Sequence, residues 1–419
     1  MKILKALNPY AGLSGLPALL WWLALATLIN RAGSMVLPFL VLYLTRNEGL
    51  TPARAGSILM LYGFVALFAS TVSGRLCDRW GPQTVMVWSL LLSGATMLVY
   101  PLADGVLAIA LATSVLSLFS EAFRPASMAV IPRLAPAPQR RKAFALNRLA
   151  VNLGMSIGPV TGGILAGWWF PSLFLVDGTT AIAAAGLLAF LFLRRQSGGP
   201  GSSLDPLTQA QGSGQPAHRN GRFLLFLLST FLIGLVFFQL DAAMPLYLVG
   251  ELGLTERDFG MVFTINTVLI LLFEVPLNAR TASWSHRAVL SLGAVLIGLG
   301  FGALALVGDF AGVAATVVIW TLGEMILFPT QAAYVADLSP PGGEGQYMGL
   351  FTTSFGLAFT LGPALGAWLL ERFGPAVVWS GALGCGLMAA VVVLLVVDEG
   401  DAVPASPAQA PAVEPAPSS

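Results

Sequence analysis

Seven ionisable side chains lie inside stretches of the sequence that are otherwise apolar enough to cross a bilayer. A charged group at the centre of a membrane costs about 2.5–3.5 kcal/mol on insertion scales, so each of these residues needs a partner or a function. Carboxylates and arginines in such positions are typical of proton relays and of pathways for charged compounds. The residues are Arg31, Glu121, Arg124, Asp177, Asp241, Glu274 and Glu324.

Three of these residues belong to the first and fourth apolar segments. Glu121 and Arg124 are three positions apart, which places them on one face of a helix, and Arg31 lies well inside the first segment. One interpretation is an internal ion pair with a second arginine nearby. The other is that the three side chains line the N-terminal half of a cavity. The spacing alone leaves both interpretations open.

Asp241 and Glu324 lie in the second half of the chain, among Met and Phe side chains that could form a deformable apolar cavity. Each carboxyl group either makes a structural hydrogen bond to a neighbouring helix or binds protons in that cavity. Glu274 lies close to Pro276, and Asp177 lies in the outer part of its segment. We expect these last two to be helix-end residues that reach water.

The composition is that of a polytopic membrane protein. Of 419 residues, 56% are hydrophobic and 10% are charged, whereas about a quarter of the residues of soluble domains are charged. The net charge of +1 gives no reason to expect a nucleic-acid partner. Cys77 and Cys385 make no metal or redox motif, and the two histidines, His218 and His286, lie in or beside loops. We therefore expect no catalytic residues, metal or cofactor, with a membrane-embedded enzyme or a sensor as remote alternatives.

Runs of about 20 apolar residues predict membrane spans, and the chain contains twelve of them. The predicted fold class is an all-α membrane protein with twelve transmembrane helices. We place these helices at 17–44, 53–73, 83–101, 105–132, 143–168, 171–193, 222–249, 257–279, 287–307, 310–336, 346–370 and 375–397.

The chain is an internal duplication. Gly362-Pro363-Ala364-Leu365-Gly366 repeats Gly158-Pro159-Val160-Thr161-Gly162 at an offset of 204 residues (362 − 158). A shared offset over many positions indicates two repeats of one architecture. This repeat offset also relates Thr51 to Thr255, Gly56 to Gly260, Pro125 to Pro329 and Pro136 to Pro340.

The duplication divides the chain into two six-helix bundles related by pseudo-symmetry. We expect an N-terminal bundle at 1–193 and a C-terminal bundle at 222–397. The Gly-, Ser- and Pro-rich residues 194–221 predict a flexible cytoplasmic linker, and the Pro- and Ala-rich residues 398–419 predict a disordered cytoplasmic tail.

The lysines and arginines predict the orientation in the membrane. Only Arg46, Arg54, Arg257 and Arg372 fall on the outer side of this topology, and the others outside the spans fall on the side of the N-terminus. The positive-inside rule then places both termini in the cytoplasm of a multi-pass plasma membrane protein, in bacteria the inner membrane.

The residues after the second span read Gly74-Arg75-Leu76-Cys77-Asp78-Arg79-Trp80-Gly81. We expect a tight turn with a glycine at each end and a carboxylate that meets a helix N-terminus or an arginine. With Gly74, Asp78, Arg79 and Gly81, this stretch resembles the loop signature of the major facilitator superfamily. Pro82 and Gln83 replace two basic residues of that signature.

The fifth span carries Gly154, Gly158, Pro159, Gly162 and Gly163. Glycines four residues apart line one helical face, so the pattern fits a seam for close helix packing. It is also similar to the Gly-x-x-x-Gly-Pro-x-x-Gly-Gly motif of the superfamily's antiporters. The resemblance covers residues 17 to 397 and implies two bundles that rock about a central site.

The resemblance also implies site residues. Arg124 resembles the arginine of the superfamily's fourth-helix proton-coupling motif, and the stretches around Asp241 and Glu324 resemble those of multidrug/proton antiporters, where such carboxylates serve coupling. Asn147 stands where those relatives have a further carboxylate. The implied function is export of small amphipathic compounds by proton antiport, from a carrier that acts as a monomer. Uptake by proton symport and lipid flipping are the alternatives.

Overall fold

The computed structural model describes residues 15–135, 139–196, 217–340 and 344–398, and these residues are helical with short connections. Within them, twelve helical segments are long and apolar enough to cross a membrane. The predicted all-α fold with twelve spans is confirmed. Most of the predicted linker and nearly all of the predicted tail lie outside the described residues, as do Met1–Ser14.

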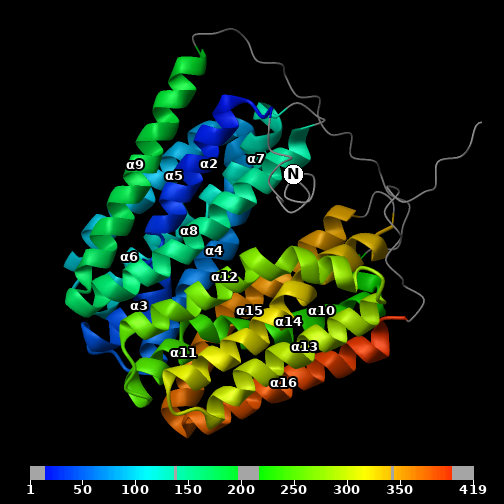
Figure 1. The fold of residues 1–419 in the computed structure, drawn as a ribbon. Helices are drawn as coiled ribbons and strands as arrows, with labels where there is room; N and C mark the ends of the chain where they lie inside the picture. The colour runs from blue at the N-terminus through cyan, green and yellow to red at the C-terminus, as the bar shows by residue number, and fades with distance from the viewer. Residues whose placement is uncertain (1–14, 136–138, 197–216, 341–343, 399–419) are drawn as a thin grey trace, which may run out of the picture.

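The helices of the N-terminal half form the first six spans (Figure 1). They are α2 (Ala18–Gly33), α3 (Val36–Arg46), α4 (Pro52–Trp80), α5 (Pro82–Val99), α6 (Gly105–Ser120), α7 (Phe123–Leu134), α8 (Arg140–Trp168) and α9 (Pro171–Gln196). The pairs α2 with α3 and α6 with α7 each make one span.

The C-terminal half repeats this arrangement. Its helices are α10 (Gly221–Phe237), α11 (Ala243–Pro245), α12 (Glu256–Thr281), α13 (His286–Gly302), α14 (Phe310–Leu338), α15 (Glu344–Phe373) and α16 (Pro375–Val396). A 3-10 turn at Phe238–Asp241 precedes α11, and a π-helical turn at Leu246–Glu251 follows it.

Three spans that the sequence predicts as continuous are broken instead. Each break lies four residues before a proline, whose ring clashes with the carbonyl group of the residue at that distance and cannot donate a hydrogen bond to it. The residue at the break and its proline are Ser34 and Pro38 in the first span, Glu121 and Pro125 in the fourth, and Asp241 and Pro245 in the seventh. Two of the seven ionisable residues therefore lie at breaks.

Pro329 leaves its helix intact, and a neighbouring span satisfies the carbonyl group that it frees. It lies inside α14, and the carbonyl oxygen of Met325, which it frees, accepts a hydrogen bond of 3.1 Å from the side-chain amide of Asn278 on α12. A neighbouring helix thus satisfies the acceptor, so α14 continues through the proline.

The turn predicted at Gly74–Gly81 is wrong over most of its length. Helix α4 continues through Gly74 to Trp80, and only Gly81, with φ +84°, forms the turn into α5. Asp78 and Arg79 are exposed on the last turn of α4, and none of the described residues pairs with Asp78.

Among the described residues, the bundles share a core at one end. The largest cluster of buried side chains runs through both halves and includes Phe39, Tyr43, Phe259 and Trp320. Two smaller clusters at the opposite end each belong to a single half. In Figure 1 the bundles accordingly meet near α3 and α11 and diverge toward the end of α9. We call these the joined end and the open end.

Candidate functional site

Asp241 lies at the break of the seventh span. The break follows from Pro245, and it leaves Ala242 with a non-helical backbone (φ −140°, ψ −71°). The Asp241 side chain is half-buried, and none of the described residues gives its carboxylate a hydrogen bond or an ion pair. A carboxylate of this kind is available to a proton or a cationic ligand.

Glu324 occupies the middle of α14 and is held by α12. The side-chain amide of Asn266 donates to Glu324 Oε2 at 2.6 Å and to the Thr321 hydroxyl at 3.1 Å. The carboxyl group is half-buried. Glu324 therefore has both the structural hydrogen bond and the membrane-interior position that the sequence left as alternatives.

The N-terminal bundle contains a cavity of about 90 Å³. Arg31, Tyr62, Glu121 and Asp177 all line it. The Tyr62 hydroxyl donates to Glu121 Oε1 at 2.9 Å, and the Arg31 Nε atom is buried without a hydrogen-bond partner among the described residues. The structure thus brings Arg31 and Glu121 together, and it adds Tyr62 and Asp177 to them.

Arg124 does not join this cavity. The break at Glu121 separates the two residues, so that Arg124 lies on α7 with an exposed side chain and is absent from the cavity lining. The described residues contain no ion pair between Glu121 and Arg124, so the structure does not show the ion pair that was one of the two interpretations.

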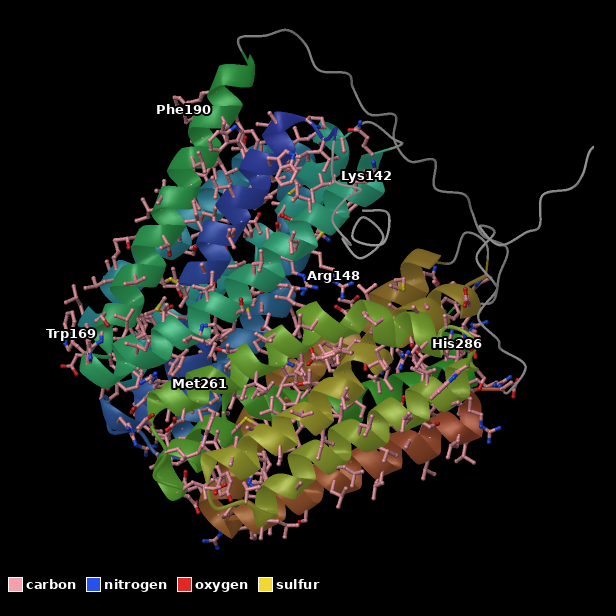
Figure 2. All side chains as sticks on the ribbon, viewed as in Figure 1. Lys142, Arg148, Trp169, Phe190, Met261 and His286 are labelled. Atoms are coloured by element: carbon pink, nitrogen blue, oxygen red, sulfur yellow. The ribbon has the colours of Figure 1, made fainter. Side chains whose placement is uncertain are left out.

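The prediction for Asp177 is also wrong, whereas Glu274 is partly exposed as predicted. Asp177 is 2% exposed, and its Oδ2 atom accepts hydrogen bonds of 3.2 Å from the backbone N–H groups of Met35 and Val36. It therefore caps the N-terminus of α3, where a helix carries unpaired donors. Glu274 forms an ion pair with Arg148 of the other bundle. Figure 2 shows Arg148 between the two bundles.

The glycines of the fifth span allow α8 to pack against the first span. A Cβ atom at Gly154 would overlap that of Arg31, one at Gly158 would lie 3.1 Å from the Arg31 carbonyl oxygen, and one at Gly162 would lie 2.8 Å from Met35 Cβ. The predicted small-residue face is confirmed as a packing seam, and it fixes the backbone that carries Arg31.

The two bundles contact each other in a pseudo-symmetric way at the joined end. A Cβ atom at Gly260 of α12 would lie 2.5 Å from the Pro159 carbonyl oxygen of α8. A Cβ atom at Gly56 of α4 would lie 3.2 Å from the Pro363 carbonyl oxygen of α15. The repeat offset relates the two glycines to each other and the two prolines to each other, so the duplicated motif makes both contacts between the bundles.

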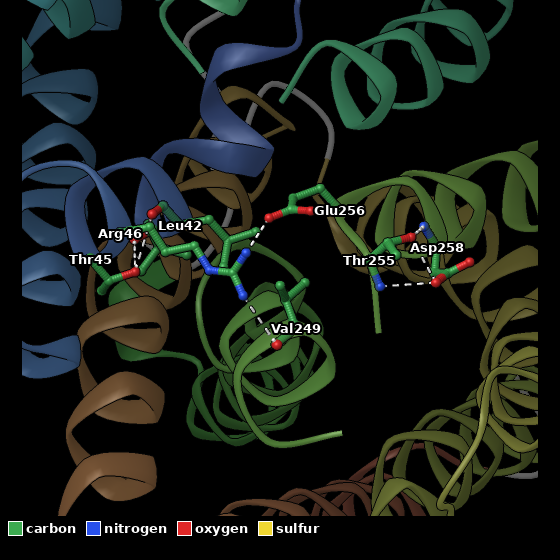
Figure 3. Close-up of polar contacts among 8 residues, drawn as sticks. Leu42, Thr45, Arg46, Val249, Thr255, Glu256 and Asp258 are labelled. Atoms are coloured by element: carbon green, nitrogen blue, oxygen red, sulfur yellow. Dashed lines mark hydrogen bonds and ion pairs between the residues drawn. The ribbon is translucent and has the colours of Figure 1, made fainter. Parts of the chain in front are cut away.

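Polar contacts reinforce the joined end. Arg46 at the end of α3 forms an ion pair with Glu256 at the start of α12, and its second nitrogen donates to the Val249 carbonyl group at 3.3 Å (Figure 3). Glu371 of α15 accepts a hydrogen bond of 2.6 Å from the backbone N–H of Ala53 in the first turn of α4.

Sequence reasoning missed Tyr62 and Asn266 because their side chains carry no charge. The repeat could have found them, since the repeat offset also separates Tyr62 from Asn266, and each donates to a carboxylate on the fourth span of its bundle. Within the described part of the chain, no group of three or more His, Cys, Asp or Glu side chains could hold a metal ion.

A protein built of two pseudo-symmetric bundles, joined at one end and separate at the other, with ionisable groups inside its spans, has the architecture of a secondary transporter. The family model described as Major Facilitator Superfamily matches residues 23–255 and 226–418. The chain therefore belongs to the Major Facilitator Superfamily, and it is a multi-pass membrane transporter.

Relatives in this family are distant. The chain is 24% identical over 363 residues to "Uncharacterized MFS-type transporter YqjV" of Bacillus subtilis, and the match spans 84% of this chain and 87% of the relative. It is 24% identical to the "Na(+), Li(+), K(+)/H(+) antiporter" of Planococcus maritimus (80% and 84%) and to "Multidrug resistance protein 2" of Bacillus subtilis (77% and 81%). A crystal structure of a POT family transporter in complex with 5-aminolevulinic acid shares the fold, with a TM-score of 0.76, 18% identity and coverage of 91% and 96%.

Proposed function

We propose that this transporter exports small amphipathic compounds from the cytoplasm in exchange for protons. The observation that carries the proposal is Asp241, an acidic side chain inside a span that no described residue pairs. A carboxylate holds either a proton or a cationic group at one time, so occupation by one excludes the other. The relatives named as a multidrug resistance protein and a cation/proton antiporter support this type of exchange.

The conformation of the bundles gives the proposal a direction. With both termini in the cytoplasm, as the lysines and arginines favour, the open end is cytoplasmic and the joined end closes the path to the outside. In this state Asp241 and Glu324 release protons inward and accept substrate. After the bundles rock, protons from outside displace the substrate outward.

The remaining site residues have supporting roles in the proposal. Arg31 and Glu121 line the cavity of the N-terminal bundle. Arg124, exposed on α7, serves the path of protons or substrate on the cytoplasmic side. The packed glycines of α8 and α15 prevent leakage while the bundles move, because they leave no gap at the crossing points.

Transport in proteoliposomes tests the proposal. An imposed pH gradient should drive a fluorescent cationic dye against its own gradient in the wild type, and both Asp241→Asn and Glu324→Gln should abolish this movement. Asp104→Asn is the matched control, since Asp104 is exposed before α6 and makes no capping hydrogen bond.

Several results would contradict the proposal. If Asp241→Asn transports dye as the wild type does, Asp241 does not couple protons to export. Dye that moves in the direction of the protons would indicate symport, and a pH gradient that moves sodium or potassium but no dye would indicate cation exchange. Translocation of fluorescent lipid alone would indicate a flippase.

A further inference from the structure

The N-terminal bundle holds a second set of ionisable groups in the cavity of about 90 Å³ described above. These groups come from separate elements: Arg31 from α2, Glu121 from the turn after α6, and Asp177 from α9. Their convergence is fixed by packing, since the α8 glycines position Arg31 and the α3 backbone positions Asp177.

Asp177 is the most buried member of this group. Its Oδ2 atom is occupied by the N–H groups of Met35 and Val36, but its Oδ1 atom is buried and has no hydrogen-bond partner among the described residues. Arg31 Nε and the Ser120 hydroxyl, which also line the cavity, are unpartnered in the same way. Buried polar atoms of this kind are rare in native proteins and need a partner.

The charges that line the cavity do not balance. One guanidinium group and two carboxylates sum to a net charge of −1 (1 − 2). Tyr62 of α4 is a neutral donor to Glu121, and α5 contributes Leu90, Ser93 and Met97 to the lining. From α3 come only apolar side chains, and α8 contributes none. Tyr43 and Tyr100 do not line the cavity: Tyr43 contacts Phe174 edge-on, and Tyr100 stacks on it. An uncompensated charge at this depth is costly.

A single proton removes the imbalance. Bound to Asp177 Oδ1 or to the free oxygen of Glu121, it makes the cavity neutral and supplies a donor for an unpaired acceptor. A metal cation fits poorly, because the Arg31 guanidinium lies in the same cavity and the described residues contain no cluster of three metal-ligating side chains.

We propose that Arg31, Glu121 and Asp177 form a proton-binding site of the N-terminal bundle that holds one proton in this conformation. The site is separate from Asp241 and Glu324 and goes beyond the exchange proposed for them. In a carrier with a proton site in each bundle, protonation acts on both of the bundles that move during transport.

Infrared difference spectroscopy of the purified protein in lipid tests the proposal without any transported compound. The carbonyl-stretch band of a protonated carboxyl group, identified by its shift in heavy water, is measured in the Asp241→Asn/Glu324→Gln background. In that background we expect a band equivalent to one buried carboxyl group at neutral pH. Because nothing is transported in this experiment, failure of the export hypothesis would leave its result unchanged.

For each further variant, the charges of the cavity predict a whole number of protonated carboxyl groups. Asp177→Asn and Glu121→Gln each bring the cavity to neutrality (1 − 1), so each should abolish the band. Arg31→Gln leaves two unpaired carboxylates, so the band should double, and Arg31→Gln with Asp177→Asn should restore the single band. Asp104→Asn should leave the band unchanged.

The proposal is overturned if the background protein shows no protonated carboxyl group at neutral pH. It is equally overturned if the band survives in either Asp177→Asn or Glu121→Gln, since each variant alone makes the cavity neutral and leaves no reason for a bound proton. The two variants remove carboxylates from different elements, so one of them decides the question where the other does not fold.

Discussion

The Tyr62 hydroxyl donates a hydrogen bond to Glu121 in the N-terminal bundle, and the Asn266 amide donates one to Glu324 in the C-terminal bundle. Tyr62 and Asn266 are 204 residues apart (266 − 62), which is the repeat offset. Glu121 and Glu324 are 203 residues apart (324 − 121), one residue less than that offset. Both bundles therefore keep a neutral donor on the second span facing an acid on the fourth, although the donor has changed from a phenol to an amide.

Removal of the Asn266 donor should impair transport through Glu324. A hydrogen bond to a charged group contributes about 1.5–3 kcal/mol, and about 1.4 kcal/mol is a tenfold change in rate. We expect Asn266→Ala to lower pH-driven dye transport about tenfold or more. The pairing itself is tested by thermal unfolding in detergent of Asn266→Ala, Glu324→Gln and the double variant: the two losses should not add, and additive losses would contradict the pairing.

The crossing of α8 and α12 at Gly260 should not tolerate a side chain. A Cβ atom there would lie 2.5 Å from the Pro159 carbonyl oxygen, so Gly260→Ala must separate the bundles at the joined end. We expect spin-label distances across that end to lengthen and dye transport to fall. Gly381→Ala is the matched control, because its added Cβ atom meets nothing within 4 Å. Equal behaviour of the two variants would exclude a role for this contact.

The Arg46 and Glu256 pair should bias the carrier toward the conformation described here. The Glu256 side chain is 13% exposed and that of Arg46 is 44% exposed, so the pair contributes at most about 1 kcal/mol. Arg46→Glu should therefore shift the conformational populations about fivefold toward opening at the joined end, measured by spin-label distances. Arg46→Glu combined with Glu256→Arg should restore the original distribution. Failure of the exchanged pair to do so would show that the charges act on other partners.

The fold was largely predictable because each span must satisfy its own backbone in the membrane. Apolar length therefore predicted the twelve spans, and the repeat predicted the packed glycines of α8. The breaks at Ser34, Glu121 and Asp241 were not predicted, although each precedes a proline by four residues. Pro329 shows why a proline alone does not predict a break: α14 continues through it, and Asn278 of another span donates to the carbonyl group that it frees.

The site was less predictable because it depends on those breaks. Arg124 follows the break at Glu121, and its side chain is exposed instead of lining the cavity that holds Glu121. The break at Ser34 exposed the N-terminus of α3, and Asp177 turned inward to cap it instead of reaching water. The partners of these carboxylates come from other spans, and the order of residues within a span does not contain that information.

The cap on α3 should be measurable as stability. Loss of a capping acceptor costs about 0.5–2 kcal/mol. Asp177 binds the N–H of Val36, the first residue of α3, and shares the N–H of Met35 with the Gly33 carbonyl oxygen at 2.8 Å. We expect Asp177→Ala to lower the midpoint of thermal unfolding in detergent. Asp177→Asn keeps a carbonyl oxygen for the same donors and should unfold close to the wild-type temperature. If both variants unfold at the same temperature, below that of the wild type, the negative charge and not the hydrogen bonds stabilises α3. If both unfold at the wild-type temperature, the cap does not contribute to stability.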